Sequence, residues 1–277
     1  MEGRWYVVDN RPMYALLSAR ALQHTAGSAA SDAPPVVLVH GLGKAAESLR
    51  DLGDALDRRG LAAHAPDLPG FGESSRHKPR RPLDIPRLAD ALDAWMGAAA
   101  VERAVVVGNS IGAQIVADLA ARRPGRCVAV VLLGPTTDPD VRSIPDQVWR
   151  WLINSRRDES AAGGGMVTAY WQAGLGRVAR TFQYSVRDRI EEKLPRISAP
   201  TLVIAGSADP IAPLHWTQRV CETLPDGRLV VLDGAAHSMH GNHPEEVADA
   251  VRDFIDSLAA GRRRRRAPTG AHRSVSP

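Results

Sequence analysis

The chain has 277 residues with a formal net charge of +4, and 44% of its residues are hydrophobic and 24% charged. These values exclude a disulfide-stapled miniprotein and a wholly disordered chain, and they allow one large α/β domain with an insertion or two small domains. Six arginines and no acidic residue lie in residues 261–277, so taking their six charges from the total leaves −2 for residues 1–260. We therefore expect no nucleic-acid binding by the body of the protein.

The first half of the chain alternates short apolar runs with helical patterns. Residues 4–8 and 13–19 predict an opening hairpin, because turn-forming residues separate them. Later apolar runs predict buried strands, and strands that alternate with helices predict a parallel sheet. The expected strands are 34–40, 61–68 and 104–108, and the expected helices are 45–59, 84–99 and 111–122.

This alternation stops at Pro135 and resumes near residue 197. We expect a core of residues 1–134 and 197–260, interrupted by a helical lid over residues 135–196. The remaining predicted elements are strands at 127–134, 201–206 and 228–232 and a closing amphipathic helix at 245–259.

The segment 135–196 holds six of the 13 aromatic residues. These rings form either the core of a small subdomain or the inner face of a lid over an apolar pocket. Arginines of the segment either bind a substrate carboxylate or are surface charges of helices. The candidate pocket residues are Trp149, Trp151, Tyr170 and Trp171, and the arginines are Arg177, Arg180, Arg187 and Arg189.

Residues 261–277 combine Arg262–Arg266 with glycine, proline and serine and show no apolar periodicity, so we expect a disordered tail. Two interpretations stay open, a solvated tail and a contact with an anionic surface. The first twenty residues lack a basic region followed by a long apolar stretch. No window approaches a membrane span, so we expect a cytoplasmic protein.

Ser110 stands between Gly108 and Gly112 at the end of the predicted strand 104–108. A sharp turn from strand to helix needs small neighbours, because the serine must adopt a strained backbone conformation that exposes its hydroxyl. The pattern predicts a nucleophile, and the hypothesis requires a base and an orienting acid elsewhere in the chain.

Two later positions meet this requirement. Asp209 follows the strand 201–206 and His237 follows the strand 228–232, so both should emerge at the same edge of the sheet as Ser110. The alternative for the acid is Asp138, which follows the preceding strand. The alternatives for the base are His240 and His243, near the start of the closing helix.

On these residues the chain resembles the α/β-hydrolase superfamily, in particular lidded serine hydrolases such as meta-cleavage product hydrolases and carboxylesterases. The resemblance implies a mostly parallel central sheet flanked by helices, with a helical lid, and a Ser110, His237 and Asp209 triad. The motifs that carry it are His40-Gly41-Leu42-Gly43, Asp67-Leu68-Pro69-Gly70-Phe71-Gly72-Glu73-Ser74, Gly108-Asn109-Ser110-Ile111-Gly112, Asp209-Pro210-Ile211 and His237.

A tetrahedral intermediate needs backbone donors for its oxyanion, and the residue after the nucleophile, Ile111, provides one. The resemblance implies that the amide of Leu42 is the second donor. His40 and Phe71 are further candidates for the pocket, although His40 is interpreted first as a residue that shapes the turn.

Within the resemblance, Ser110 excludes haloalkane dehalogenases and epoxide hydrolases, which use an aspartate there. We expect hydrolysis of a small, fairly apolar substrate with an ester-like or carbon-carbon bond. The alternatives are a cofactor-free lyase or oxygenase and a receptor-like binding protein with a vestigial triad. We expect no cofactor and no metal, because the histidines of residues 237–243 are poorly spaced as ligands. The identity of the substrate and the oligomeric state are not predicted.

Overall fold

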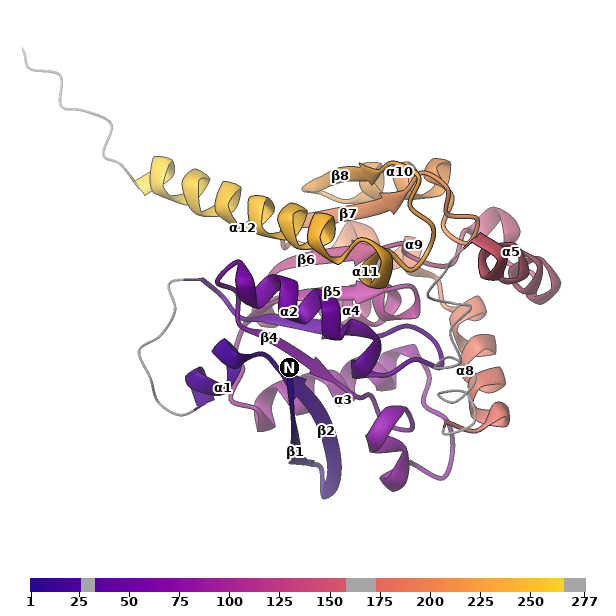
Figure 1. Ribbon diagram of the computed structural model, residues 1–277. Helices are drawn as coiled ribbons and strands as arrows, with labels where there is room; N and C mark the ends of the chain where they lie inside the picture. Colours follow the sequence, from indigo (N-terminus) through magenta and orange to yellow (C-terminus); the bar gives the residue numbers. More distant parts are fainter. Residues whose placement is uncertain (26–32, 158–172, 267–277) are drawn as a thin grey trace, which may run out of the picture.

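A computed structural model of the protein describes residues 1–25, 33–157 and 173–266 (Figure 1). Eight strands of this part form one sheet in the order β1-β2-β4-β3-β5-β6-β7-β8. The first two strands pair antiparallel, β2 also runs antiparallel to β4, and every later pair is parallel. The strands are β1 Glu2–Val8, β2 Arg11–Leu17, β3 Val36–Val39, β4 Ala63–Pro66, β5 Ala104–Asn109, β6 Cys127–Leu133, β7 Thr201–Gly206 and β8 Gly227–Leu232.

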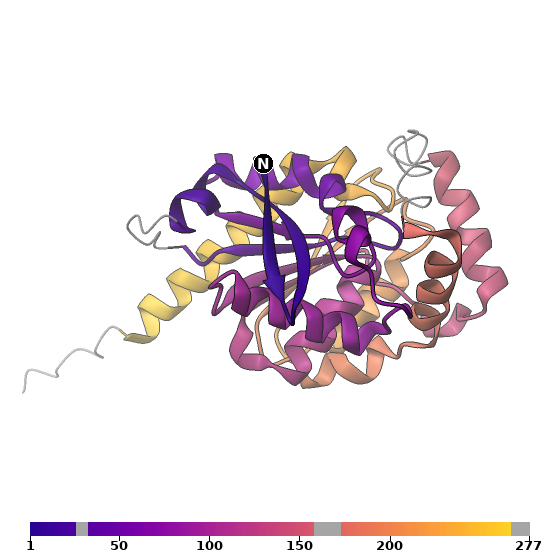
Figure 2. The same ribbon diagram turned by 90° about the horizontal axis from the view of Figure 1, so that it is seen from below.

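Helices cover both faces of the sheet (Figures 1 and 2). One apolar core lies between the sheet and α3, α4 and α10, and the other lies between the sheet and α2 and α12. Consecutive residues of a strand point to opposite faces, so Val37 and Val39 pack in the first core and Val36 and Leu38 in the second. The helices are α2 Arg50–Arg58, α3 Ile85–Ala98, α4 Ile111–Arg122, α10 Leu214–Thr223 and α12 Pro244–Arg266.

The described part of residues 135–196 contains helices and no strand. Both views show α5 and α8 beyond one end of the sheet (Figures 1 and 2). Hydrogen bonds between α5 and both Ile211 and His237, which follow β7 and β8, show that this is the end where those strands have their carboxyl ends. The elements are α5 Ile144–Arg157, α8 Leu175–Arg187 and α9 Ile190–Lys193, with 3-10 helices at Pro139–Val141 and Leu194–Arg196.

The predicted α/β fold is confirmed, and all predicted strands and helices of the core are present with small differences at their ends. One prediction is wrong: α12 continues to Arg266, so residues 261–266 are helical and not disordered. Arginine is a good helix former, and the helix already running through residues 244–260 needs no new nucleation to continue. Two short helices were not predicted, α1 Ala19–Thr25 and α11 Met239–Asn242, and 3-10 helices occur at Ala46–Leu49, Gly72–His77 and Pro124–Arg126. No helix of the described residues is long and apolar enough to cross a membrane.

Candidate active site

Ser110 forms a strained turn between β5 and α4, with φ of 57° and ψ of −120°. The two flanking glycines leave no room for a side chain. A Cβ on Gly108 would lie 2.2 Å from the carbonyl oxygen of Gly112, and a Cβ on Gly112 would lie 2.3 Å from that of Val39. The Ser110 amide donates to Leu133 O at 2.9 Å, which ties the turn to the neighbouring strand β6. The structure therefore has the tight elbow that the sequence pattern predicts.

His237 and Asp209 meet after the last two strands. His237 Nδ1 lies 2.7 Å from Asp209 Oδ2, and both side chains are buried. Because a carboxylate only accepts, Nδ1 carries the proton and Nε2 of the neutral ring is left as an acceptor. Nε2 is buried and has no hydrogen-bond partner among the described residues. This tautomer is the one that a histidine acting as a general base requires.

Asp209 is held at both carboxylate oxygens. Oδ1 accepts the backbone amides of Ile211 at 2.8 Å and Ala212 at 3.0 Å, while Oδ2 faces His237. Burial raises the pKa of this carboxyl, but the nearby His237 and the hydrogen bonds from His237, Ala212 and Ile211 outweigh it, so its pKa lies below the ordinary value. Asp209 is therefore ionised at neutral pH.

Gly134, directly after β6, makes room for this pair. Its φ is +50°, and a Cβ there would lie 3.0 Å from His237 Nδ1 and 3.1 Å from Asp209 Oδ2. Gly134 was not among the predicted site residues. Its signal was a glycine at the end of an apolar strand, which is also common in ordinary turns.

The turn after β3 packs against the serine. A Cβ on Gly41 would lie 3.2 Å from Asn109 Oδ1 and 3.4 Å from Ser110 Cβ, so a larger residue there would press on the side chain next to the serine. Leu42 and Ile111, the residues predicted to donate to an oxyanion, line the same cavity as Ser110 and His237.

His40 and Phe71 do not line that cavity, so the prediction that they are pocket residues is wrong. His40 Nδ1 donates to Gly41 O at 2.9 Å, and its Nε2 accepts the Leu68 amide at 3.1 Å. Burial lowers the pKa of His40 to about 4, which keeps the ring neutral for these two bonds. The ring of Phe71 packs edge-on against it, with 5.5 Å between centroids. Both side chains brace the turn from behind.

The cavity has a volume of about 90 Å³ and reaches from the serine elbow to α5 and α8. Trp151 lines it, as predicted, but Trp149 does not and its side chain is 60% exposed. Tyr170 and Trp171 lie outside the described residues. The polar residues of the cavity wall were not among the predicted pocket residues. The full lining is Gly41, Leu42, Lys44, Asn109, Ser110, Ile111, Thr136, Thr137, Gln147, Trp151, Asn154, Phe182, Ser185, Ile211, His237 and Ser238.

The alternative triad members are engaged elsewhere. Asp138 is fully buried and lies 3.3 Å from both Arg150 Nη2 and His215 Nε2. His240 Nε2 lies 3.5 Å from Lys44 Nζ, and His243 Nδ1 lies 3.4 Å from Glu246 Oε1. Of the two candidate acids, Asp209 is the one that contacts His237.

The four arginines of the insertion do not line the cavity. Arg177 Nη2 donates to Pro79 O at 2.6 Å, which fastens α8 to the segment after β4, and burial lowers its pKa. Arg180 donates to Gln183 and Arg189 pairs with Glu192 on exposed helix surface, where Arg187 also lies. Surface charge and helix anchoring describe them better than substrate binding.

A serine in a tight strand-to-helix turn, sharing a cavity with a histidine that pairs with an aspartate from another loop of a mostly parallel sheet, is the arrangement of the α/β-hydrolase fold. Residues 36–250 match the model of the Alpha/beta hydrolase family, and the chain belongs to that family. The resemblance stated from the motifs is thereby confirmed.

Relatives whose names state an activity align with most of the chain. Epoxide hydrolase A of Mycobacterium tuberculosis is 28% identical, over 82% of this chain and 91% of its own. The pimeloyl-[acyl-carrier protein] methyl ester esterase of Xanthomonas campestris is 26% identical, over 81% and 96%. Among solved structures, a meta-cleavage product hydrolase from Pseudomonas fluorescens superimposes with a TM-score of 0.72 at 21% identity, covering 92% of this chain and 98% of that one. At 21% identity, the comparison with this solved structure shows that the two proteins share a fold.

Proposed function

We propose that the protein is a serine hydrolase that cleaves small carboxylic esters. The observation that carries the proposal is the Asp209–His237 pair, whose Nε2 is left as an acceptor in the cavity that Ser110 also lines. A serine hydroxyl is a poor nucleophile at neutral pH unless such a base takes its proton.

In the proposed reaction Ser110 Oγ attacks the ester carbonyl while His237 Nε2 takes the hydroxyl proton. Asp209 holds the ring in the required tautomer and stabilises the imidazolium. The amides of Leu42 and Ile111 donate to the oxyanion of the tetrahedral intermediate. His237 then protonates the leaving alcohol, and a water activated by the same histidine hydrolyses the acyl-enzyme.

The size of the cavity favours an ester with a short acyl group. The cavity measures about 90 Å³, less than an engineered cavity of about 150 Å³ that binds benzene, so we infer that it holds the acyl group and that the alcohol part extends toward its opening. Carbon-carbon cleavage is the second candidate, because a meta-cleavage product hydrolase shares the fold. A serine at position 110 also argues against epoxide opening by a carboxylate nucleophile, although one relative is named an epoxide hydrolase.

The test compares the parent with Ser110→Ala on short p-nitrophenyl esters and with a fluorophosphonate probe. The matched control is Ser185→Ala, because Ser185 lines the same cavity but supplies its carbonyl, not its side chain, to the bond with Gln114. We expect turnover and labelling in the parent and the control, and neither in Ser110→Ala. A parent that neither turns over nor labels would overturn the proposal and favour a binding protein or a different reaction.

A further inference from the structure

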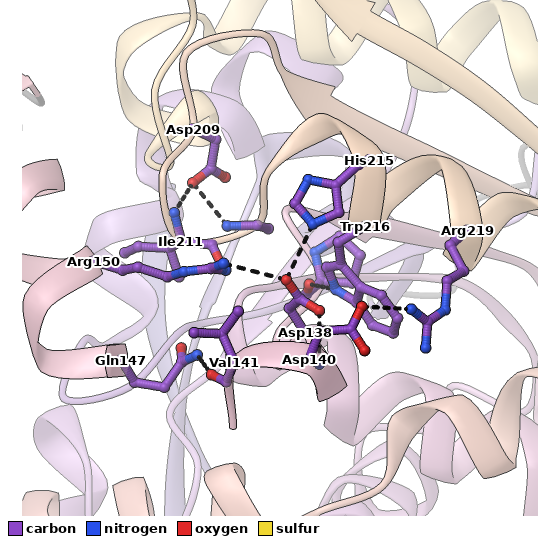
Figure 3. Close-up of polar contacts among 12 residues, drawn as sticks. Asp138, Asp140, Val141, Gln147, Arg150, Asp209, Ile211, His215, Trp216 and Arg219 are labelled. Atoms are coloured by element: carbon purple, nitrogen blue, oxygen red, sulfur yellow. Dashed lines mark hydrogen bonds and ion pairs between the residues drawn. The ribbon is translucent and has the colours of Figure 1, made fainter. Parts of the chain in front are cut away.

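An ionic cluster around one buried carboxylate lies beside the Asp209–His237 pair and joins three separate segments of the chain (Figure 3). Its centre is Asp138, which is fully buried in the segment after β6. Arg150 reaches it from α5 and His215 from the start of α10, each at 3.3 Å from Oδ2. The amide of Asp140 donates to the other oxygen, Oδ1, at 3.1 Å. The carboxylate is therefore held from several sides at a fixed place.

Arg150 makes a second bond that leads to the triad. Its Nη2 faces Asp138, while its Nη1 donates to the carbonyl oxygen of Ile211 at 3.4 Å. The amide of that same Ile211 donates to Asp209 Oδ1 at 2.8 Å. One peptide residue thus connects the guanidinium on α5 with the carboxylate that orients His237, and Figure 3 shows the three groups in this order.

The same helix also reaches the histidine. Asn154, one turn after Arg150, accepts the backbone amide of His237 at 3.3 Å through Oδ1. Residues four apart lie on one face of a helix. The face of α5 that carries Arg150 and Asn154 is therefore in contact with the segments that hold both the acid and the base.

We propose that Arg150 is a positioning residue for the triad: it fastens α5 to the Asp209 loop and so fixes the direction in which Asp209 faces His237. This inference rests on the proposed function of the site. A guanidinium suits the role because its planar fork can bond two acceptors at once, whereas an ammonium is a single point of charge.

The chain offers a matched control in the same cluster. Arg219 Nη1 donates to Asp140 Oδ2 at 2.9 Å, so it forms an arginine–aspartate pair with the same 3-10 segment as Asp138. Its side chain is half exposed, and its ion pair is with Asp140 and not with the Asp209 loop. Arg219→Met removes a more exposed arginine–aspartate pair of the same segment and leaves the connection through Ile211 in place.

The experiment compares Arg150→Met and Arg219→Met in two readouts. The first is kcat and KM on p-nitrophenyl acetate per active site titrated with the fluorophosphonate. The second is the low-field proton NMR resonance of His237 Nδ1–H, which reports the bond to Asp209 without any substrate. We expect Arg150→Met to lower kcat per titrated site by about 10- to 100-fold with a much smaller change in KM, and to shift or broaden the resonance. Arg219→Met should leave both unchanged.

A parent without ester turnover would refute the proposed function, and the resonance alone would then decide the role of Arg150. An unchanged resonance in Arg150→Met, or an equal effect in Arg219→Met, would overturn the inference. If Arg150→Met does not fold, Arg150→Lys retains a charge against Asp138 but loses the fork. We expect Arg150→Lys to have the same Tm as the parent but a lower kcat. A kcat equal to that of the parent would contradict the proposal that Arg150 positions the triad.

Discussion

Replacement of Asp209 by asparagine tests the proposed triad most directly, because the two oxygens of this carboxylate have different hydrogen-bond partners. Oδ1 accepts two backbone amides and Oδ2 accepts the proton of His237 Nδ1 at 2.7 Å. Asparagine has one acceptor oxygen and one NH₂ donor. If its oxygen keeps the two amides, the NH₂ faces Nδ1 and forces the histidine into the tautomer with a proton on Nε2. If the oxygen faces Nδ1, the NH₂ opposes the two amide donors of Ile211 and Ala212.

In the first orientation Nε2 of His237 carries the proton, so it cannot accept one from Ser110. In the second orientation the asparagine loses its hydrogen bonds to the two amides, so it holds the histidine ring less firmly. We expect Asp209→Asn to lower kcat by ~10³–10⁴, as loss of the triad acid does in other serine enzymes. This corresponds to about 4–5 kcal/mol of lost transition-state stabilisation. The assay is single-turnover and steady-state hydrolysis of p-nitrophenyl acetate, with circular dichroism to confirm folding.

The control is Asp138→Asn, which changes the other buried carboxylate near the site but leaves the Asp209–His237 contact in place. We expect a loss of less than about tenfold there, since only the support of the loop is weakened. A small effect at Asp209 together with a collapse at Asp138 would refute the reasoning and transfer the acid role to Asp138.

Three further predictions concern the surroundings of the triad. Gly134→Ala places a methyl group about 3 Å from both His237 and Asp209, so kcat should fall by about 10²; Gly125→Ala, whose Cβ meets nothing within 4 Å, should be neutral, and equal kcat in both would contradict the crowding. Trp151→Ala should enlarge the cavity and raise kcat/KM for p-nitrophenyl hexanoate relative to acetate, while Trp149→Ala on the outer face should leave the ratio unchanged; an unaltered ratio in Trp151→Ala would mean that this ring does not limit acyl length. His40 has a pKa of about 4 in the folded protein against 6.5 ordinarily, so the unfolded chain binds its proton first and about 3 kcal/mol of stability is lost as pH falls from 6.5 to 4. Urea unfolding of His40→Gln, which keeps one donor and one acceptor, should show a flatter dependence over that window, and a dependence identical to the parent would exclude His40 as its source.

Strand ends explain why the central residues could be predicted from sequence. An apolar run locates a buried strand, and the carboxyl ends of parallel strands share one edge, so Ser110, Asp209 and His237 had to meet there whatever the loops did in detail. The choice between Asp209 and Asp138 could not be made this way, because both follow parallel strands of the sheet. It depends on side-chain directions in the loops.

The residues of the cavity wall were harder to predict, because the orientation of each helix determines which of its side chains face the cavity. Trp149 and Trp151 are two positions apart on α5, so they point to different sides, and composition does not say which side faces the cavity. The role of Arg150 could not be predicted from sequence, because its partners Asp138 and Ile211 come from two other segments of the chain. Phe71 and His40 matched motifs near the site but pack behind the turn, because a motif identifies a loop and not the direction of its side chains.

The order of strands in the chain has a consequence for synthesis. Ser110 follows β5 in the middle of the sheet, whereas His237 follows β8 more than a hundred residues later. A nascent polypeptide on the ribosome therefore contains Ser110 long before His237 has been synthesised. Under the proposed function, Ser110 lacks its base until β7 and β8 join the sheet. A fluorophosphonate should then label only chains that have been extended past residue 237 and folded.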